Sequence, residues 1–490
     1  MTSTWSGRRT KSVEQSIEDT DEPGTRLRKD LTWFDLIVFG VSVVIGAGIF
    51  TITASTAGGI TGPAISISFI FAAVACGLAA LCYAEFASTV PVAGSAYTFS
   101  YASFGEVVAW IIGWDLVLEF AVGAATVAKS WSTYLGEVFG FAGGELHLGG
   151  LDLDWGAALI VAIVTTLLAI GTKLSSRVSA VITAIKVAVV LVVIIVGAFF
   201  IKAANYTPFV PPAEQGGSSG DQSLFSLLTG AGSSNYGWYG VLAGASIVFF
   251  AFIGFDVVAT TAEETKNPQR DVPRGIFGTL AIVTVLYVAV AVVLSGMVKY
   301  TELEKAGEDA NLATAFSLNG VDWAATLISV GALAGLTTVV MVLMLGQTRV
   351  LFAMSRDRLL PHQLAQTGDR GTPVKLTILV GVLVAAAAAF FPITKLEEMV
   401  NVGTLFAFVL VSAGVIILRR NRPDLHRAFR TPLVPWLPIA AIVACVWLML
   451  NLTALTWIRF LVWMAIGMAV YFLYGRRHSA LAQRESAISA

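Results

Sequence analysis

The sequence predicts an all-α polytopic membrane protein, and three observations support that class. Of the 490 residues, 56% are hydrophobic and only 13% are charged, whereas soluble domains usually carry about 25% charged residues. The mean hydropathy is +0.78. The apolar runs are long and mostly lack the alternation of apolar and polar faces that a soluble core requires.

Twelve apolar runs are long enough to cross a bilayer. They cover residues 34–57, 63–90, 106–134, 155–171, 178–201, 238–262, 273–298, 323–351, 374–391, 396–418, 434–455 and 457–474. Most Lys and Arg residues fall in the tails and in the connections that are cytoplasmic if the chain begins inside the cell. That bias agrees with the positive-inside rule. We therefore expect twelve plasma-membrane spans with both termini cytoplasmic.

Two of these runs are interrupted near the middle of the membrane. The first contains VIGAGIF at residues 44–50, and the sixth contains SIVFFAFIGFD at residues 246–256. Glycine weakens a helix interior, and a lone Gly-x-Gly is also explained by close helix packing. Interruptions in corresponding spans of two halves, however, indicate a transporter site built on inverted repeats.

An unwound membrane segment leaves backbone groups that need partners, so it is tolerated where it lines a cavity. Freed N–H groups at a half-helix suit a carboxylate, and freed carbonyl groups suit an ammonium. An α-amino acid carries both groups. The two interruptions therefore predict a site for a small zwitterion.

The first and sixth spans would open the halves of a five-plus-five repeat followed by two trailing spans. This gives a disordered cytoplasmic tail at 1–30, a first repeat at 31–202, a second repeat at 203–420, two trailing spans at 421–475 and a cytoplasmic tail at 476–490.

Four stretches of the chain resemble the amino acid–polyamine–organocation (APC) superfamily. They are LTWFDLIVFGVSVVIGAGIF, YAEFASTVPVAGSAYTFSYASFGEVVAWIIGWDLVLEF, FFAFIGFDVVATTAEETKNPQRDVPRGI and GQTRVLFAMSRDRLLP. They occur in order and with matching spacing across residues 31–418, and the nearest branch is that of the cationic amino acid transporters and their bacterial relatives. The resemblance implies a LeuT-type fold that imports amino acids by alternating access.

The resemblance also implies a set of substrate contacts. Main-chain amides would bind the substrate carboxylate at Ile45, Gly46, Ala47, Gly48 and Ile49, and carbonyl groups would bind its ammonium at Ala251 and Ile253. Phe250 matches an aromatic gate, with a core aromatic residue as the alternative. Leu336 matches a position that bounds the side-chain pocket.

Six ionisable residues lie within the predicted spans, and each is costly there and hence a functional candidate. They are Glu85, Asp115, Glu119, Lys129, Lys186 and Asp256. The resemblance places the Lys186 ammonium where sodium-coupled relatives bind a cation, with carbonyl groups of the broken first span and the hydroxyl of Thr337 or Thr338 as expected partners. Lys186 would then couple proton movement to conformational change, with snorkelling to the interface as the alternative.

The remaining ionisable residues have two interpretations each. Asp256 is either a proton relay or gate, or a cap on unwound backbone. Glu119 shares a helix face with Asp115 and serves a proton path or a basic substrate, or else makes a hydrogen bond inside the bundle. Glu85 is expected to be structural or part of an inner gate, and Lys129 is expected to snorkel.

These features predict a proton-coupled amino acid importer. An exchanger and a sodium-coupled or uncoupled permease are the alternatives, although Lys186 in the cation site argues against sodium. The four histidines lie in loops or tails without metal-ligand spacing, so we expect neither an enzyme nor a metal or cofactor. The expected partners are an amino acid, protons and lipid, and no nucleic acid. The sequence leaves cationic and neutral substrates both open.

Overall fold

The computed structural model describes residues 30–89, 95–140, 145–148, 151–171, 176–215, 222–230, 234–366 and 372–482. The predicted disorder of the N-terminal tail lies, except for residue 30, outside these residues. The last part of the predicted C-terminal tail, residues 483–490, also lies outside them.

The described chain is built from apolar helices. Eight helical segments are long and apolar enough to cross a membrane. They correspond to α4 (Ile65–Thr89), α6 (Glu106–Phe139), α8 (Ser176–Ala198), α10 (Gly237–Val248), α12 (Pro268–Met297), α15 (Asp322–Arg356), α17 (Ile393–Asn421) and α19 (Ala454–Val470). Four shorter apolar helices accompany them: α2 (Trp33–Val44), α7 (Trp155–Ile170), α16 (Val374–Phe390) and α18 (Trp436–Leu450). The polytopic membrane class is thereby confirmed.

Short elements connect these helices. The short helices are α3 (Thr53–Thr56), α5 (Ser95–Ser103), α9 (Leu224–Thr229), α11 (Val257–Thr260), α13 (Tyr300–Ala306), α14 (Leu312–Ser317) and α20 (Arg476–His478). Two small antiparallel strand pairs, absent from the all-α prediction, join β1 (Glu145–Leu148) to β2 (Leu151–Asp154) and β3 (Glu214–Gln215) to β4 (Ser234–Asn235).

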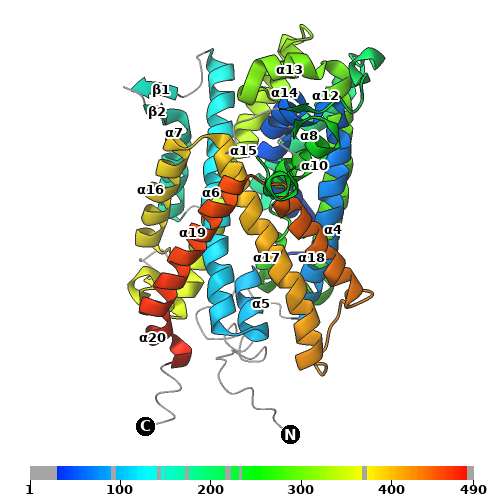
Figure 1. Ribbon diagram of the computed structural model, residues 1–490. Helices are drawn as coiled ribbons and strands as arrows, with labels where there is room; N and C mark the ends of the chain where they lie inside the picture. Colours follow the sequence, from blue (N-terminus) through cyan, green and yellow to red (C-terminus); the bar gives the residue numbers. More distant parts are fainter. Residues whose placement is uncertain are drawn as a thin grey trace, which may run out of the picture.

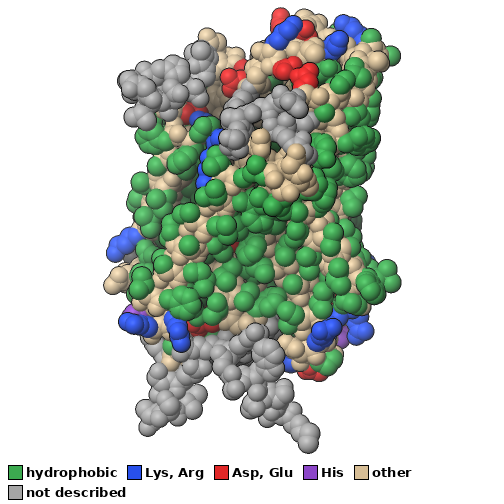
Figure 2. Space-filling model, viewed as in Figure 1, with side chains coloured by type: hydrophobic (Ala, Val, Ile, Leu, Met, Phe, Trp, Pro, Cys, Tyr) green, Lys and Arg blue, Asp and Glu red, His purple; other side chains and the backbone are tan. Residues whose placement is uncertain are grey.

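The helices stand roughly side by side and form a tall bundle (Figure 1). Helices α5 and α20 lie at one end, whereas α13, α14 and the β1–β2 hairpin lie at the opposite end. The face seen in Figure 2 is mostly hydrophobic over its middle, and charged side chains gather toward the two ends. Many large apolar side chains point outward, among them Val285 and Val382. An apolar outer band of this kind suits contact with lipid tails.

Helix α6 runs through the bundle and packs against α15 and α17, whereas α12 packs against α4 and α2. Helix α8 contacts α15, α12 and α2. The residues of the two interruptions are largely buried within this packing, so the interruptions are shielded from lipid.

Local sequence signals fix where several helices begin. The Thr32 side chain and Asp35 form a reciprocal capping box at the start of α2, and Asp154 caps α7 by accepting a hydrogen bond from the Ala157 N–H at 2.9 Å. Such caps satisfy N–H groups that have no partner inside the helix.

Candidate functional site

The first predicted interruption is present in the structure. Helix α2 ends at Val44, and Ile45 adopts an extended conformation (φ −71°, ψ 93°). The chain then resumes as a π-helical turn over Gly48–Ile52. The interruption therefore leaves the regular α-helical pattern at the predicted glycines.

Side chains from three other helices bind the carbonyl groups next to this interruption. Lys186 Nζ on α8 donates to the Ser42 carbonyl at 2.6 Å, and the Tyr287 hydroxyl on α12 donates to the Val44 carbonyl at 2.7 Å. The Tyr134 hydroxyl on α6 donates to the Phe50 carbonyl at 2.5 Å. Because a buried carbonyl without a partner is costly, these contacts stabilise the broken segment.

The second predicted interruption is present as well. Helix α10 ends at Val248, a 3₁₀ turn follows over Phe249–Phe252, and Ile253 is extended. Gly254 has φ +110°, a conformation that L side chains rarely adopt. Asn401 Nδ2 on α17 donates to the Ser246 carbonyl at 2.9 Å and thereby stabilises the backbone before this interruption.

The two interruptions touch each other. A Cβ atom on Gly48 would overlap the backbone of Ala251, so only glycine permits this approach. Segments from the first and sixth predicted spans thus meet backbone to backbone inside the bundle.

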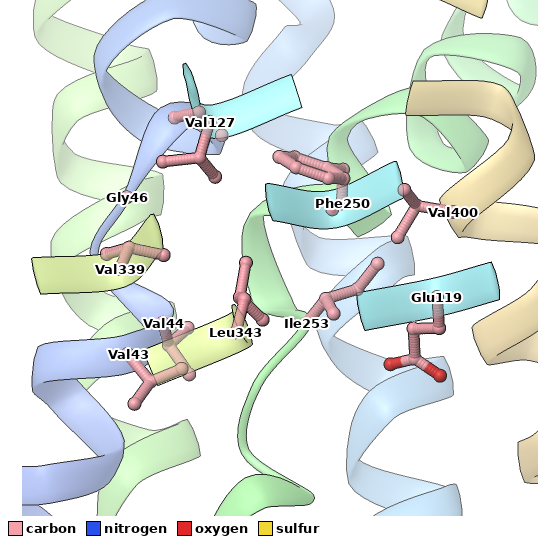
Figure 3. A pocket seen from close by; sticks show the side chains of 13 residues that line it. Val43, Val44, Gly46, Glu119, Val127, Phe250, Ile253, Val339, Leu343 and Val400 are labelled. Carbon is pink, nitrogen blue, oxygen red and sulfur yellow. The ribbon is translucent and has the colours of Figure 1, made fainter. Parts of the chain in front are cut away.

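A narrow cavity lies beside this contact (Figure 3). Its wall comes from α2, the two interruptions, α6, α15 and α17. The lining residues are Val43, Val44, Gly46, Ala47, Gly48, Glu119, Gly123, Val127, Phe250, Ile253, Val339, Leu343 and Val400. Glu119 is the one charged residue among them.

Six of the predicted site residues therefore line one cavity, namely Gly46, Ala47, Gly48, Phe250, Ile253 and Glu119. The others predicted to bind substrate do not line it, although each is buried: Ile45, Ile49, Ala251 and Leu336. On α15 the cavity is bounded by Val339 and Leu343, which follow Leu336 along the same helix.

Lys186 is fully buried and lies next to the cavity wall rather than in it. Its aliphatic stem packs against Gly335, where an added Cβ would lie 2.8 Å from Lys186 Cε. The expected carbonyl contact with the first span is present. The Thr338 hydroxyl instead donates to the Gly335 carbonyl, and the Thr337 hydroxyl donates to the Leu333 carbonyl.

Three buried carboxyl groups interact here: Glu119 lines the cavity, and Asp115 and Asp256 lie close enough to act on it electrostatically. Neither carboxyl oxygen of Asp115 or Asp256 has a hydrogen-bond partner in the described part of the chain, and Oε1 of Glu119 also has none. Glu119 is within electrostatic range of both Asp115 and Asp256. The Asp256 side chain makes no cap hydrogen bond at the start of α11, and the choice between a proton relay or gate and a cap on unwound backbone stays a prediction.

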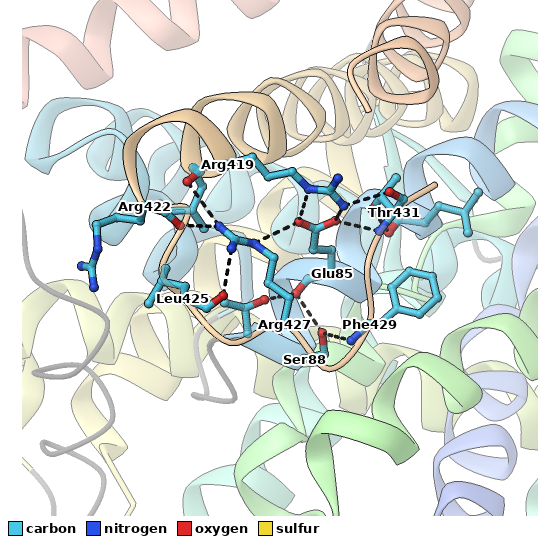
Figure 4. A network of polar contacts seen from close by, with 11 residues as sticks. Glu85, Ser88, Arg419, Arg422, Leu425, Arg427, Phe429 and Thr431 are labelled. Atoms are coloured by element: carbon cyan, nitrogen blue, oxygen red, sulfur yellow. Dashed lines mark hydrogen bonds and ion pairs between the residues drawn. The ribbon is translucent and has the colours of Figure 1, made fainter. Parts of the chain in front are cut away.

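Glu85, in contrast, has hydrogen-bond partners for both of its carboxylate oxygens (Figure 4). Arg419 binds both of its carboxylate oxygens, with Nε–Oε1 at 2.9 Å and Nη2–Oε2 at 2.6 Å, and Arg427 Nε lies 3.4 Å from Oε1. The Thr431 N–H donates to Oε2 at 2.8 Å. Burial lowers the pKa of Arg427, and the Glu85 charge opposes that shift. This cluster ties α4 to α17 and to the connection that precedes α18.

The prediction that Lys129 snorkels is wrong. Lys129 Nζ lies 3.3 Å from Asp154 Oδ2, and only 11% and 5% of the two side chains are exposed. Asp154 also accepts a hydrogen bond from Ser132 and caps α7. Lys129 therefore joins α6 to the start of α7, because a buried ammonium with a carboxylate in reach is stabilised by pairing with it.

Sequence reasoning missed several residues of the site. Three of them donate hydrogen bonds to backbone carbonyl groups at the interruptions, namely Tyr134, Tyr287 and Asn401. In the sequence, the only indication of this role was a polar group inside an apolar run. Val400 and Val339 carried no signal, because valine is common on every face of these helices.

Comparison with known proteins identifies relatives of this architecture. The family described as amino acid permease matches residues 31–474. The branched-chain amino acid permease BcaP of Bacillus subtilis (strain 168) is 42% identical over 488 residues, which cover 97% of this chain and 99% of that protein. The methylthioribose transporter of the same organism is 41% identical over 467 residues, which cover 93% and 95%.

A plant protein is also similar. The vacuolar cationic amino acid transporter 4 of Arabidopsis thaliana is 39% identical over 408 residues, which cover 81% of this chain and 64% of that protein. The fold and these relatives define a multi-pass membrane transport protein rather than an enzyme. The chain belongs to the amino acid permease family, within the APC superfamily that the sequence resembles.

Proposed function

We propose that this protein imports amino acids across the plasma membrane by alternating access and that a proton gradient drives the import. The observation that carries the proposal is the cavity at which two interrupted helices meet, next to a buried lysine that holds one of the interrupted segments. An exchanger and a sodium-coupled or uncoupled permease remain the alternative mechanisms.

The proposed architecture has twelve spans with both termini in the cytoplasm. The eight long and four shorter apolar helices support that number, with the first span made of α2 and the segment after its interruption. The two interruptions then fall in spans one and six, as a LeuT-type five-plus-five repeat with two trailing spans requires. The repeats would occupy residues 31–202 and 203–420, and the trailing spans residues 421–475.

In this proposal the substrate binds mainly to backbone. The N–H groups of the segment from Ile45 to Ile49 would bind its carboxylate, and the carbonyl groups of Ala251 and Ile253 would bind its ammonium. Phe250 would cover the bound molecule. Ala47 has no hydroxyl to offer, so main-chain groups provide the polar contacts on this side of the cavity.

Lys186 would act as the coupling group. Its ammonium donates to the Ser42 carbonyl, so loss of the proton would weaken the contact that holds α2 at the interruption. A group that binds α2 in one protonation state and releases it in the other links proton transfer to helix movement. Glu119 and Asp256 would carry the proton between Lys186 and the lower end of the bundle, because both are buried near the cavity without a full set of partners.

The test is uptake into proteoliposomes with and without an inward proton gradient, together with thermal-shift binding of amino acids to the purified protein. We expect Lys186→Ala to abolish gradient-driven accumulation while substrate exchange at zero gradient and binding persist. Lys305→Ala is the matched control, since Lys305 is exposed and pairs only with its neighbour Glu302 in the contacts seen here. Accumulation by Lys186→Ala at the wild-type level would overturn the coupling role.

A further inference from the structure

The cavity has two chemically different sides. The side formed by the interruptions offers main-chain groups, whereas the side formed by α6, α15 and α17 offers apolar side chains and, at one place, the carboxyl group of Glu119. Apart from Glu119, this second side is lined by Gly123, Val127, Val339, Leu343 and Val400. None of these five residues has a polar side-chain atom.

Gly123 is the exception in this wall, because it contributes no side chain. A Cβ atom at this position would lie 3.6 Å from Leu343 Cδ1 and 4.0 Å from Val400 Cγ1, which are ordinary van der Waals distances. Packing therefore does not require glycine here. Gly113 on the same helix differs, since a Cβ there would come within 2.9 Å of Tyr97 and Met354.

The backbone does not require glycine at this position either. Gly123 lies inside the regular helix α6 and is not among the glycines with positive φ. Glycine destabilises a helix interior relative to alanine. Because Gly123 lines the cavity, glycine leaves free the space beside Leu343 and Val400 that a side chain at this position would occupy.

We propose that Gly123 sets the size limit for the substrate side chain and that the site takes neutral amino acids with aliphatic side chains. This inference rests on the proposed function. The side chain of the substrate would lie against Val127, Val339, Leu343 and Val400 and fill the space that Gly123 leaves.

Glu119 does not make this a site for cationic side chains. In Figure 3 its carboxyl group points away from Val127 and Gly46, toward the lower end of the view. It also interacts electrostatically with Asp115 and Asp256. A guanidinium or ammonium placed against the valine and leucine wall would lose its hydration without a facing partner, which is costly.

The experiment measures binding and uptake of alanine, valine, leucine, isoleucine, lysine, arginine and methylthioribose by the full-length protein in proteoliposomes. The wild type is expected to prefer valine, leucine and isoleucine over lysine and arginine. Gly123→Ala should weaken leucine and isoleucine binding about tenfold and alanine binding less than about twofold, since one added methyl group in a tight apolar pocket has effects of this size. Gly123→Val should extend the loss to valine.

Gly77→Ala is the matched control, because Gly77 lies in α4 and an added Cβ meets nothing within 4 Å. It should leave the substrate order unchanged. Equal weakening of all amino acids by Gly123→Ala, no change in their order, or a wild-type preference for arginine would overturn the inference while leaving amino acid import intact. Failure of the proposed function would look different, namely no uptake of any amino acid, or uptake of methylthioribose alone.

Discussion

Four buried carboxyl groups of this protein divide into two kinds. Glu85, at the end of α4, is bound by two arginines and a backbone N–H. Asp115, Glu119 and Asp256, deeper in the bundle, have carboxyl oxygens with no hydrogen-bond partner in the described residues. All four are at least 97% buried, so burial alone does not distinguish them.

This difference separates a carboxylate that stabilises the structure from carboxyl groups that are available for proton transfer. A carboxylate whose oxygens are bound by arginine side chains holds neighbouring helices and loops together. Protonating that carboxylate would break those contacts. A buried carboxyl group without partners destabilises the fold and persists where a function requires it. Loss of the first kind should therefore reduce stability, whereas loss of the second kind should not.

The largest effect is expected at Glu85. Glu85→Ala leaves Arg427 and Arg419 without their carboxylate, and removing one partner of a buried ion pair costs about 3–5 kcal/mol. The measurement is thermal unfolding of the purified protein in detergent. Glu302→Ala, which removes the exposed partner of Lys305, should cost at most about 1 kcal/mol. Equal effects of the two variants would contradict the structural role of Glu85.

A smaller loss is expected at the pair between α6 and α7. Asp154→Ala removes the cap of α7, the hydrogen bond from Ser132 and the partner of Lys129, and we expect a loss of about 2–4 kcal/mol. Asp154→Asn keeps an oxygen that can cap α7, so its loss should be smaller. If thermal unfolding shows the same loss for both variants, the cap of α7 contributes nothing beyond the ion pair with Lys129.

The smallest effect on stability is expected at Asp115. Asp115→Asn removes a buried acid that has no hydrogen-bond partner, so the unfolding free energy should stay within about 0.5 kcal/mol of the wild type or rise. The same unfolding assay measures it. A loss of about 2 kcal/mol or more would show that Asp115 makes a stabilising contact, and the two kinds of carboxyl group would no longer be distinct.

Much of the membrane architecture could be predicted from sequence because long apolar runs and charged connections follow directly from the properties of the bilayer. The interruptions at residues 44–50 and 246–256 were also predictable, since glycine inside an apolar helix is a local signal. The carbonyl partner of Lys186 belonged to the first span, as expected. The role of Lys186 in coupling stays a prediction.

The partner of Lys129 and the α15 residues that line the cavity could not be predicted from the sequence. Lys129 was expected at the lipid interface, but Asp154, 25 positions later, lies against it after the hairpin β1–β2 turns the chain back. Leu336 was expected at the cavity, but the rotation of α15 turns Val339 and Leu343 toward it instead. Both outcomes depend on how helices are rotated and paired, and uniformly apolar helices carry little information about rotation.

The sequence by itself determined that this chain is a polytopic membrane protein and which two segments interrupt their helices. It did so because hydropathy and helix-breaking residues act locally. Only the tertiary structure decided that Gly48 meets Ala251, that two arginines bind Glu85, and that Gly123 lines the cavity. These contacts join residues far apart in the chain, and their geometry is set by the packing of whole helices rather than by the residues themselves.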